Sequence, residues 1–182
     1  DLHLENTKIE TTAKGAIKVN EHLQTSVPNI YAIGDVAGNP QFTYISLDDF
    51  RIITDQLFGK AQRSTKDRET FAYCSFLNPP FARIGLTEKQ ALEQGYTIKV
   101  WKLEWAAIPK ARILEKAQWL LKAVIDEKTG RILGASLYCA EAHEMINIIS
   151  LAMKRNLPYT ALSNHIFTHP TMSEALNDLF KL

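Results

Sequence analysis

Residues 60–68, KAQRSTKDR, form a polar stretch that has neither helical nor strand periodicity. Such a stretch is typical of a linker. Before it, a short strand pattern, a turn and a helix pattern follow one another; after it, several strand patterns come in a run with helix patterns around them. We therefore predict a small α/β segment followed by an α+β domain, in which helices flank an antiparallel sheet.

The first part has two strand patterns and one helix pattern. Weak alternation over residues 16–20 and β-formers over residues 29–33 predict two short strands, the second ending at Gly34-Asp35. The sequence SLDDFRIITDQLFG then predicts a helix capped by Ser46 and stopped by Gly59. Its buried stripe is expected to be Leu47, Phe50, Ile53 and Leu57.

The second part opens with two short strand patterns, FAYCSF and FARIGL, kept apart by Asn78-Pro79-Pro80. Thr87 and Gln90 have the spacing of a capping box for a helix that ends near Gly95. Three more strands are expected in YTIKVWKLEW, QWLLKAVIDEKTG and RILGASLYCA, and a hairpin at residues 127–130 joins the last two.

Two helices are expected at the carboxy-terminal end, over residues 141–155 and 172–180. The buried stripe of the first is expected to be Met145, Ile148, Ile149 and Ala152. The three tryptophans are interpreted as packing residues in the sheet: Trp101, Trp105 and Trp119.

Composition excludes several classes of function. The net charge of the 182 residues is +1 and the basic residues are scattered, so neither nucleic acid nor an anionic membrane is an expected partner. No apolar run reaches the roughly 20 residues of a membrane span. Cys74 and Cys139 are too far apart for a redox or zinc motif, and we interpret both as buried reduced thiols in a cytoplasmic protein. No metal-ligand cluster is present in the sequence.

The first candidate site is the turn NIYAIGDVAG. A strand that ends in Gly34-Asp35 places a carboxylate at the edge of a sheet, where it can accept hydrogen bonds from the hydroxyl groups of a sugar or polyol. The free N–H groups expected at the start of the next helix, around Ile45 to Leu47, suit a ligand atom that becomes negative, for example the pyrimidine oxygen of a reduced flavin. The alternatives are that Asp35 only caps a turn and that Asp48 and Asp49 satisfy the helix start.

The second candidate site is HPTMSEAL. A histidine, His169, stands before a proline, and Glu174 follows five residues later, which is a pattern suited to proton transfer. The alternatives are that His169 is a turn residue and that Glu174 only completes a capping box with Thr171. His165 is interpreted as structural.

Four motifs in order resemble one family. TSVPNIYAIGDVAG with FTYISLDDFRI resembles the second flavin motif of the pyridine nucleotide-disulfide oxidoreductases, which include glutathione reductase, dihydrolipoamide dehydrogenase and mercuric reductase. NPPFARIGLTEKQA resembles the start of their dimerisation domain. TGRILGASLYCAEAHEMINIISLAMKRNLP resembles its central hairpin and helix, and HIFTHPTMSEAL its carboxy-terminal signature. The resemblance covers nearly the whole chain.

This resemblance implies a division of the chain. Residues 1–62 would be the carboxy-terminal segment of a FAD-binding domain, residues 63–70 a linker, and residues 71–182 the dimerisation domain. Asp35 would bind hydroxyl groups of FAD, Gly34 would let the backbone turn sharply and approach the cofactor, and Thr43 would lie near the pyrimidine edge of the flavin. His169 would be the catalytic acid/base, oriented by Glu174, and would reach across a homodimer interface to the flavin-proximal disulfide of the other subunit.

The resemblance also implies missing parts. The chain has no GxGxxG for FAD, no second fingerprint for NAD(P)H and no redox cysteine pair, so it is expected to be the carboxy-terminal part of a longer polypeptide and inactive alone. The absence of a carboxy-terminal cysteine pair argues against a mercuric reductase. FTYISLDDFRI is more similar to a bacterial branch associated with reactive-chlorine or hypothiocyanite stress. A non-enzymatic dimerisation module and an unrelated small-molecule binding domain are the alternatives.

Overall fold

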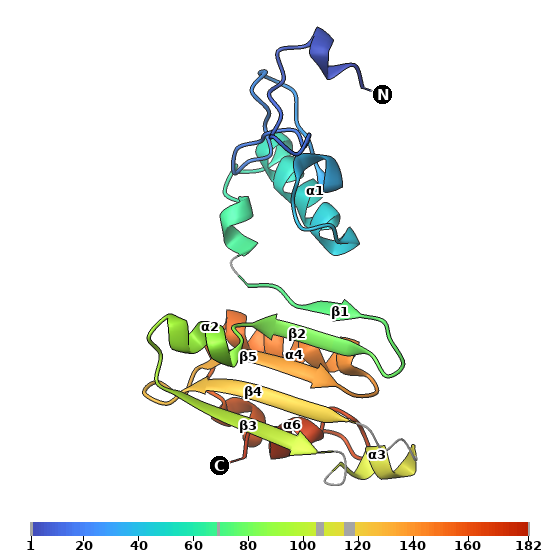
Figure 1. The fold of residues 1–182 in the computed structure, drawn as a ribbon, viewed down its shortest axis with the longest axis vertical. Helices are drawn as coiled ribbons and strands as arrows, with labels where there is room; N and C mark the ends of the chain where they lie inside the picture. Colours follow the sequence, from blue (N-terminus) through green and yellow to red (C-terminus); the bar gives the residue numbers. More distant parts are fainter. Residues whose placement is uncertain (1, 69, 105–107, 115–118, 182) are drawn as a thin grey trace. The chain divides into compact units, whose positions relative to one another are not determined.

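The structure is a computed structural model that describes residues 2–68, 70–104, 108–114 and 119–181. It divides into two compact units, Asp1–Glu69 and Thr70–Leu182 (Figure 1). Among the described residues, no helix has the length and apolar composition needed to cross a membrane.

The first unit is built around one long helix, α1 (Thr43–Phe58), with short 3₁₀ turns η1 (Leu4–Asn6), η2 (Gly34–Ala37) and η3 (Thr65–Arg68). The two strands expected over residues 16–20 and 29–33 are wrong. These segments form only the single bridges Thr11↔Ile17 and Gln24↔Tyr31 within the described part of the unit. A strand pattern needs a continuous neighbouring strand to become a ladder, and here turn backbones accept the hydrogen bonds instead.

The helix α1 exists as expected, but its start and its buried face differ from the expectation. It begins at Thr43, follows Phe42 without a side-chain cap, and ends before Gly59. Its buried residues are Ile45, Asp49 and Ile52. The expected stripe is therefore wrong: Ile53 is half-buried, and the exposed members are Leu47, Phe50 and Leu57. Apolar residues occur on two faces of this helix. Other segments of the same unit cover the face that carries the Asp49 carboxylate.

The second unit contains a five-stranded antiparallel sheet in the order β1-β2-β5-β4-β3 (Figure 1). Its strands are β1 (Tyr73–Ser75), β2 (Phe81–Gly85), β3 (Ile98–Glu104), β4 (Leu120–Asp126) and β5 (Ile132–Tyr138). The mixed fold with an antiparallel sheet is thereby confirmed, as is the hairpin between β4 and β5. The ends of two expected strands, at Trp105 and Gln118, lie outside the described residues.

The helices of the second unit agree in part with the starts and ends expected from the sequence. Thr87 and Gln90 form the capping box that starts α2 (Glu88–Glu93). The helix expected over residues 141–155 is α4 (Ala142–Lys154), and the one expected over residues 172–180 is the shorter α6 (Ala175–Leu179). Two short helices were not expected, α3 (Pro109–Ile113) and α5 (Thr160–Ser163).

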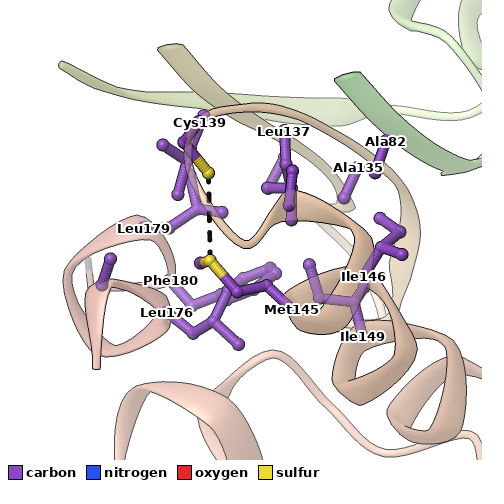
Figure 2. Packing of buried hydrophobic residues seen from close by; sticks show 14 of the residues in the cluster. Ala82, Ala135, Leu137, Cys139, Met145, Ile146, Ile149, Leu176, Leu179 and Phe180 are labelled. Carbon is purple, nitrogen blue, oxygen red and sulfur yellow. Dashed lines mark hydrogen bonds between the residues drawn. The ribbon is translucent and has the colours of Figure 1, made fainter. Parts of the chain in front are cut away.

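The core of this unit lies between one face of the sheet and the helices α4 and α6 (Figure 1). Met145, Ile149 and Ala152 of the expected stripe are buried, and Ile148 is half-buried. Figure 2 shows Met145 of α4 facing Cys139, with Leu176 and Phe180 of the α6 region beside them. The two sulfur atoms, Cys139 Sγ and Met145 Sδ, are 3.9 Å apart.

The packing role expected for the tryptophans and the burial expected for the cysteines agree with the structure for most of the described residues. Trp119 is buried, and Trp101 contacts Tyr159 edge-on with ring centroids 5.0 Å apart. Trp105 lies outside the described residues. Both cysteines are free, but only Cys139 is fully buried; Cys74 is half-buried because β1 is an edge strand. The expectation of two buried thiols is therefore wrong for Cys74.

Candidate functional site

The segment between α5 and α6 brings His169 and Glu174 together. The Nδ1 atom of His169 lies 2.7 Å from Oε2 of Glu174. The other carboxylate oxygen, Oε1, accepts a hydrogen bond from the backbone N–H of Thr171 at 3.0 Å, and Thr171 Oγ1 accepts one from the Glu174 N–H at 3.3 Å. The reciprocal bonds of a capping box and the contact to His169 are therefore both present, because each oxygen of Glu174 has a separate partner. The box closes the turn before α6, which begins at Ala175 without a side-chain cap.

This geometry determines which nitrogen of His169 is available. An ionised carboxylate can only accept, so Nδ1 carries the proton that points to Glu174 and Nε2 is left as the basic nitrogen. The His169 side chain is 67% exposed, whereas that of Glu174 is 17% exposed. In the part of the chain that the structure describes, no hydrogen bond engages Nε2. The imidazole is held on one side and open to an outside group on the other.

A side chain that the sequence analysis missed holds the preceding loop. The Nδ2 group of Asn177, on α6, donates to the backbone carbonyls of Leu162, Ser163 and His165 at 2.8, 3.1 and 2.9 Å. The His165 ring is exposed and contacts Phe167 edge-on, with ring centroids 4.6 Å apart. No local pattern marks Asn177, because its partners lie 12 to 15 residues earlier in the chain.

The turn at Gly34 lies in the first unit, against α1. Gly34 has φ +68°, and a Cβ atom there would lie 2.9 Å from Ser46 Oγ. Its N–H donates to Asp49 Oδ2 at 2.6 Å. Asp35 follows on η2 and is exposed, and within the described residues its carboxylate makes no hydrogen bond. A side chain at residue 34 would therefore disturb the turn that presents this carboxylate.

The start of α1 carries no side-chain cap. Thr43 is its exposed first residue. The alternative that Asp48 and Asp49 satisfy this helix start is wrong, because both carboxylates lie more than one turn into the helix and bind elsewhere. The expectation of free N–H groups around Ile45 is wrong, because the Ile45 and Ser46 N–H groups donate to the Phe42 carbonyl at 2.9 and 3.1 Å. What the helix start still offers a negative ligand atom is the positive end of its dipole.

Two carboxylates of α1 pair with arginines that follow the helix. Asp48 accepts from Arg63 Nη2 at 2.8 Å and from Arg68 Nε at 2.5 Å, and Asp49 Oδ1 accepts from Arg68 Nη2. Burial tends to raise the pKa of Asp48, but the hydrogen bonds and charges of Arg68 and Arg63 outweigh burial, so this pKa lies below its usual range. No local sequence pattern marks this cluster, because Arg68 lies 19 residues after Asp49.

Within the described ranges, the site residues form no candidate metal centre. Among the described residues, no three His, Cys, Asp or Glu side chains gather as metal ligands. The candidate chemistry is therefore that of an exposed imidazole backed by a carboxylate in one unit, and of an exposed carboxylate on a glycine turn in the other.

Both units match protein families that are already known. Residues 71–180 match the family described as "Pyridine nucleotide-disulphide oxidoreductase, dimerisation domain", and residues 1–49 match the one described as "Pyridine nucleotide-disulphide oxidoreductase". The chain is 53% identical over 181 residues to the probable pyridine nucleotide-disulfide oxidoreductase RclA of Escherichia coli, covering 100% of this chain and 41% of that protein. It is 34% identical over 175 residues to mercuric reductase of Staphylococcus aureus, covering 96% of this chain and 32% of that one.

A solved structure agrees with this similarity. The Cu(II) complex of the HOCl-induced flavoprotein disulfide reductase RclA from Escherichia coli superposes with a TM-score of 0.98 at 52% identity, covering 100% of this chain and 42% of that one. The chain thus spans about two fifths of the length of this relative, and less of the mercuric reductase.

Proposed function

The chain belongs to the pyridine nucleotide-disulphide oxidoreductases, and from that membership we propose that it forms the carboxy-terminal part of a FAD-dependent, NAD(P)H-driven disulfide oxidoreductase. In this proposal the Thr70–Leu182 unit supplies the homodimer interface and the acid/base pair His169 and Glu174. The Asp1–Glu69 unit supplies Gly34, Asp35 and Thr43 to the FAD site. The domains that hold the rest of FAD and NAD(P)H precede it in the same polypeptide.

The observation that carries the proposal is the state of His169. The His169 imidazole is 67% exposed and is held through Nδ1 by the Glu174 carboxylate, which leaves Nε2 accessible to a group outside this chain. Ile166, in the same loop, is 93% exposed, as an apolar side chain would be in the isolated chain if it packs against a partner subunit in the dimer. Both features support a second subunit at this loop.

The residues of this chain would act on protons. FAD, when bound, supplies two-electron transfer from NAD(P)H to a disulfide. His169 Nε2 would take the proton of the thiol released from that disulfide, which keeps a thiolate available for attack on the substrate. Glu174 would hold the Nδ1–H tautomer and stabilise the imidazolium that forms. The same imidazolium would return the proton when the substrate thiol leaves.

The first unit fits a flavin nucleotide. Gly34 lacks the Cβ atom that would collide with Ser46, the Asp35 carboxylate is exposed for hydroxyl groups, and the start of α1 at Thr43 is uncapped. These three features lie within one short stretch of chain. They support, in this unit, binding of the ribityl and pyrimidine parts of FAD.

The similarity also suggests a setting. We place the enzyme in the cytoplasm, because both of its cysteines are free, as reduced thiols are there. The solved relative from Escherichia coli is described as HOCl-induced, and by similarity we propose a role in the response to reactive chlorine.

The test is His169→Gln in the full-length enzyme, with His165→Gln as the matched control. His165 is an exposed histidine four residues earlier in the same loop. We expect His169→Gln to slow thiol–disulfide interchange by about 100-fold, while reduction of the flavin by NAD(P)H keeps its rate. Stopped-flow absorbance separates the two steps. Equal turnover of the wild-type, His169→Gln and His165→Gln enzymes would remove the catalytic role.

A non-enzymatic dimerisation module is the second candidate, and the hydrogen bond of Glu174 to the Thr171 N–H favours it, because Glu174 then has a structural use without catalysis. Mixing the 182-residue chain with a separately expressed amino-terminal half distinguishes the two. The enzyme proposal expects NAD(P)H-dependent disulfide reduction from the mixture, and neither flavin absorbance nor turnover from the chain alone. No activity in a mixture that forms a stable complex would favour the module.

A further inference from the structure

Asp49 is the buried centre of the first unit. Its side chain is fully buried, and it joins three segments of the chain. Oδ2 accepts the Gly34 N–H at 2.6 Å and the Asn39 Nδ2 group at 3.3 Å, while Oδ1 accepts Arg68 Nη2. Asp49 itself does not belong to the turn, because it lies 15 residues after Gly34 on α1. From this arrangement we infer that Asp49 is a positioning residue that holds the Gly34–Ala37 turn in the conformation that binds FAD.

Arg68 accounts for the charge of Asp49. A buried carboxylate without a partner is costly, and it persists where a cation and hydrogen-bond donors surround it. The Arg68 side chain is 12% exposed and pairs with both Asp48 and Asp49, while Arg63 adds a second contact to Asp48. Arg68 comes from η3, after α1 has ended. The turn, the helix and the segment after the helix are thereby joined through one carboxylate.

The contact acts on the backbone just before the candidate cofactor residue. Gly34 is left-handed at φ +68° and lies against Ser46, so its peptide has little freedom on the side of α1. The bond from Gly34 N–H to Asp49 fixes the direction of that peptide, and the next residue is the exposed Asp35. Asp49 would therefore act through Gly34, without touching the cofactor. This inference rests on the proposed FAD site and adds a residue outside its motif.

The experiment compares FAD dissociation constants of full-length variants, measured by flavin fluorescence in titrations of the apoprotein. Asp49→Ala removes the acceptor, and we expect about tenfold weaker binding, as loss of one buried hydrogen bond predicts. Asp49→Asn keeps an oxygen for the Gly34 N–H but turns its amide N–H group towards the Arg68 Nη2 donor, so its affinity should lie between those of wild type and Asp49→Ala. The matched control is Asp48→Ala, which loses an Arg68 contact but none to the turn, and it should stay within about threefold of wild type.

A second variant keeps the test decisive if Asp49→Ala does not fold. Asp49→Leu combined with Arg68→Met replaces both partners by apolar side chains, an exchange that buried pairs often tolerate, yet it leaves the Gly34 N–H without an acceptor. This folded variant should also bind FAD about tenfold more weakly. Circular dichroism of each apoprotein establishes that the compared variants are folded.

Three results would overturn the inference: wild-type affinity in Asp49→Ala or in the double variant, equal weakening in Asp48→Ala and Asp49→Ala, or equal weakening in Asp49→Asn and Asp49→Ala. Asp35→Ala separates this outcome from a failure of the proposed function. If Asp35→Ala also binds FAD as wild type does, the FAD site itself is wrong. If Asp35→Ala is weak and Asp49→Ala is not, only the positioning role fails.

Discussion

At the scale of single residues, the most informative side chain is Glu174, because its two oxygens have different partners. Oε1 stabilises the turn before α6 through Thr171, and Oε2 orients His169. A sequence pattern that fits a helix cap and a catalytic pair equally well does not have to be one or the other. Substitutions can separate the two roles.

Glu174→Gln keeps a carbonyl oxygen for the Thr171 N–H but loses the negative charge beside His169. We expect its free energy of unfolding to stay within about 0.5 kcal/mol of wild type, whereas Glu174→Ala loses about 1 kcal/mol with the hydrogen bond from the Thr171 N–H. Both variants should slow interchange in the full-length enzyme by at least about tenfold. Urea titration and stopped-flow kinetics give the two numbers. Full activity in Glu174→Gln would show that its charge has no catalytic part.

The two thiols differ in environment and should differ in reactivity. Burial, and next the Glu141 carboxylate, raise the pKa of Cys139 to about 12, and burial also raises the pKa of Cys74, which is half-buried. At about pH 8 Cys139 is therefore almost entirely a protonated thiol, so it should resist a disulfide reagent in the folded chain while Cys74 reacts slowly. In denaturant both should react at one rate. Rapid labelling of Cys139 in the folded chain would contradict its burial.

At the scale of elements, periodicity was reliable where one helix face meets one sheet. The stripe of α4 follows the core because the sheet covers only that face. In α1 the apolar pattern predicted that the face with Phe50 is buried, whereas the buried face is the one with Asp49. The Asp49 carboxylate is stable there because three donors bind it. Apolar periodicity cannot identify a buried face that carries a carboxylate. Phe50, in the expected stripe, is 58% exposed.

The core role of α4 can be tested with two residues two positions apart. Ile149→Ala removes a fully buried side chain against the sheet and should lower the free energy of unfolding by about 3 kcal/mol. Leu151 is exposed on the same helix, so Leu151→Ala should change it by less than about 0.5 kcal/mol. Urea titrations of the chain provide the comparison, and similar losses in both variants would mean that a partner or another surface covers Leu151.

At the scale of the whole molecule, the two units differ in how many apolar side chains each buries. The described residues of the first unit bury five apolar side chains: Ile17, Leu23, Ala32, Ile45 and Ile52. The second unit buries a continuous cluster between its sheet and helices. A small unit with so little apolar burial does not offset its chain entropy alone.

Expressed separately, residues 70–182 should therefore unfold cooperatively in urea, and residues 1–69 should not. Sedimentation of the 70–182 unit should report a dimer, because the proposed partner surface around Ile166 and His169 belongs to it. A folded monomer at concentrations up to about 100 μM would contradict the proposed interface. Cooperative unfolding of residues 1–69 would show that their charge cluster stabilises them more than their core suggests.

The sequence by itself determined the features that depend on neighbours along the chain. Spacing over a few residues predicted the strands of the antiparallel sheet and the β4–β5 hairpin. It also predicted the capping box of Thr87 and Gln90 and the buried stripe of α4. The family resemblance pointed to His169 and Glu174, and five residues of separation were short enough for the turn to join them.

Only the tertiary structure decided which faces are covered and which distant charges meet. Arg68 reaches Asp49 across 19 residues, and Asn177 reaches the loop before His169 across 12 or more. Both contacts depend on the path of the backbone, which no local pattern contains. The exposure of His169 has the same origin, because burial is set by what packs against a side chain rather than by its neighbours in sequence.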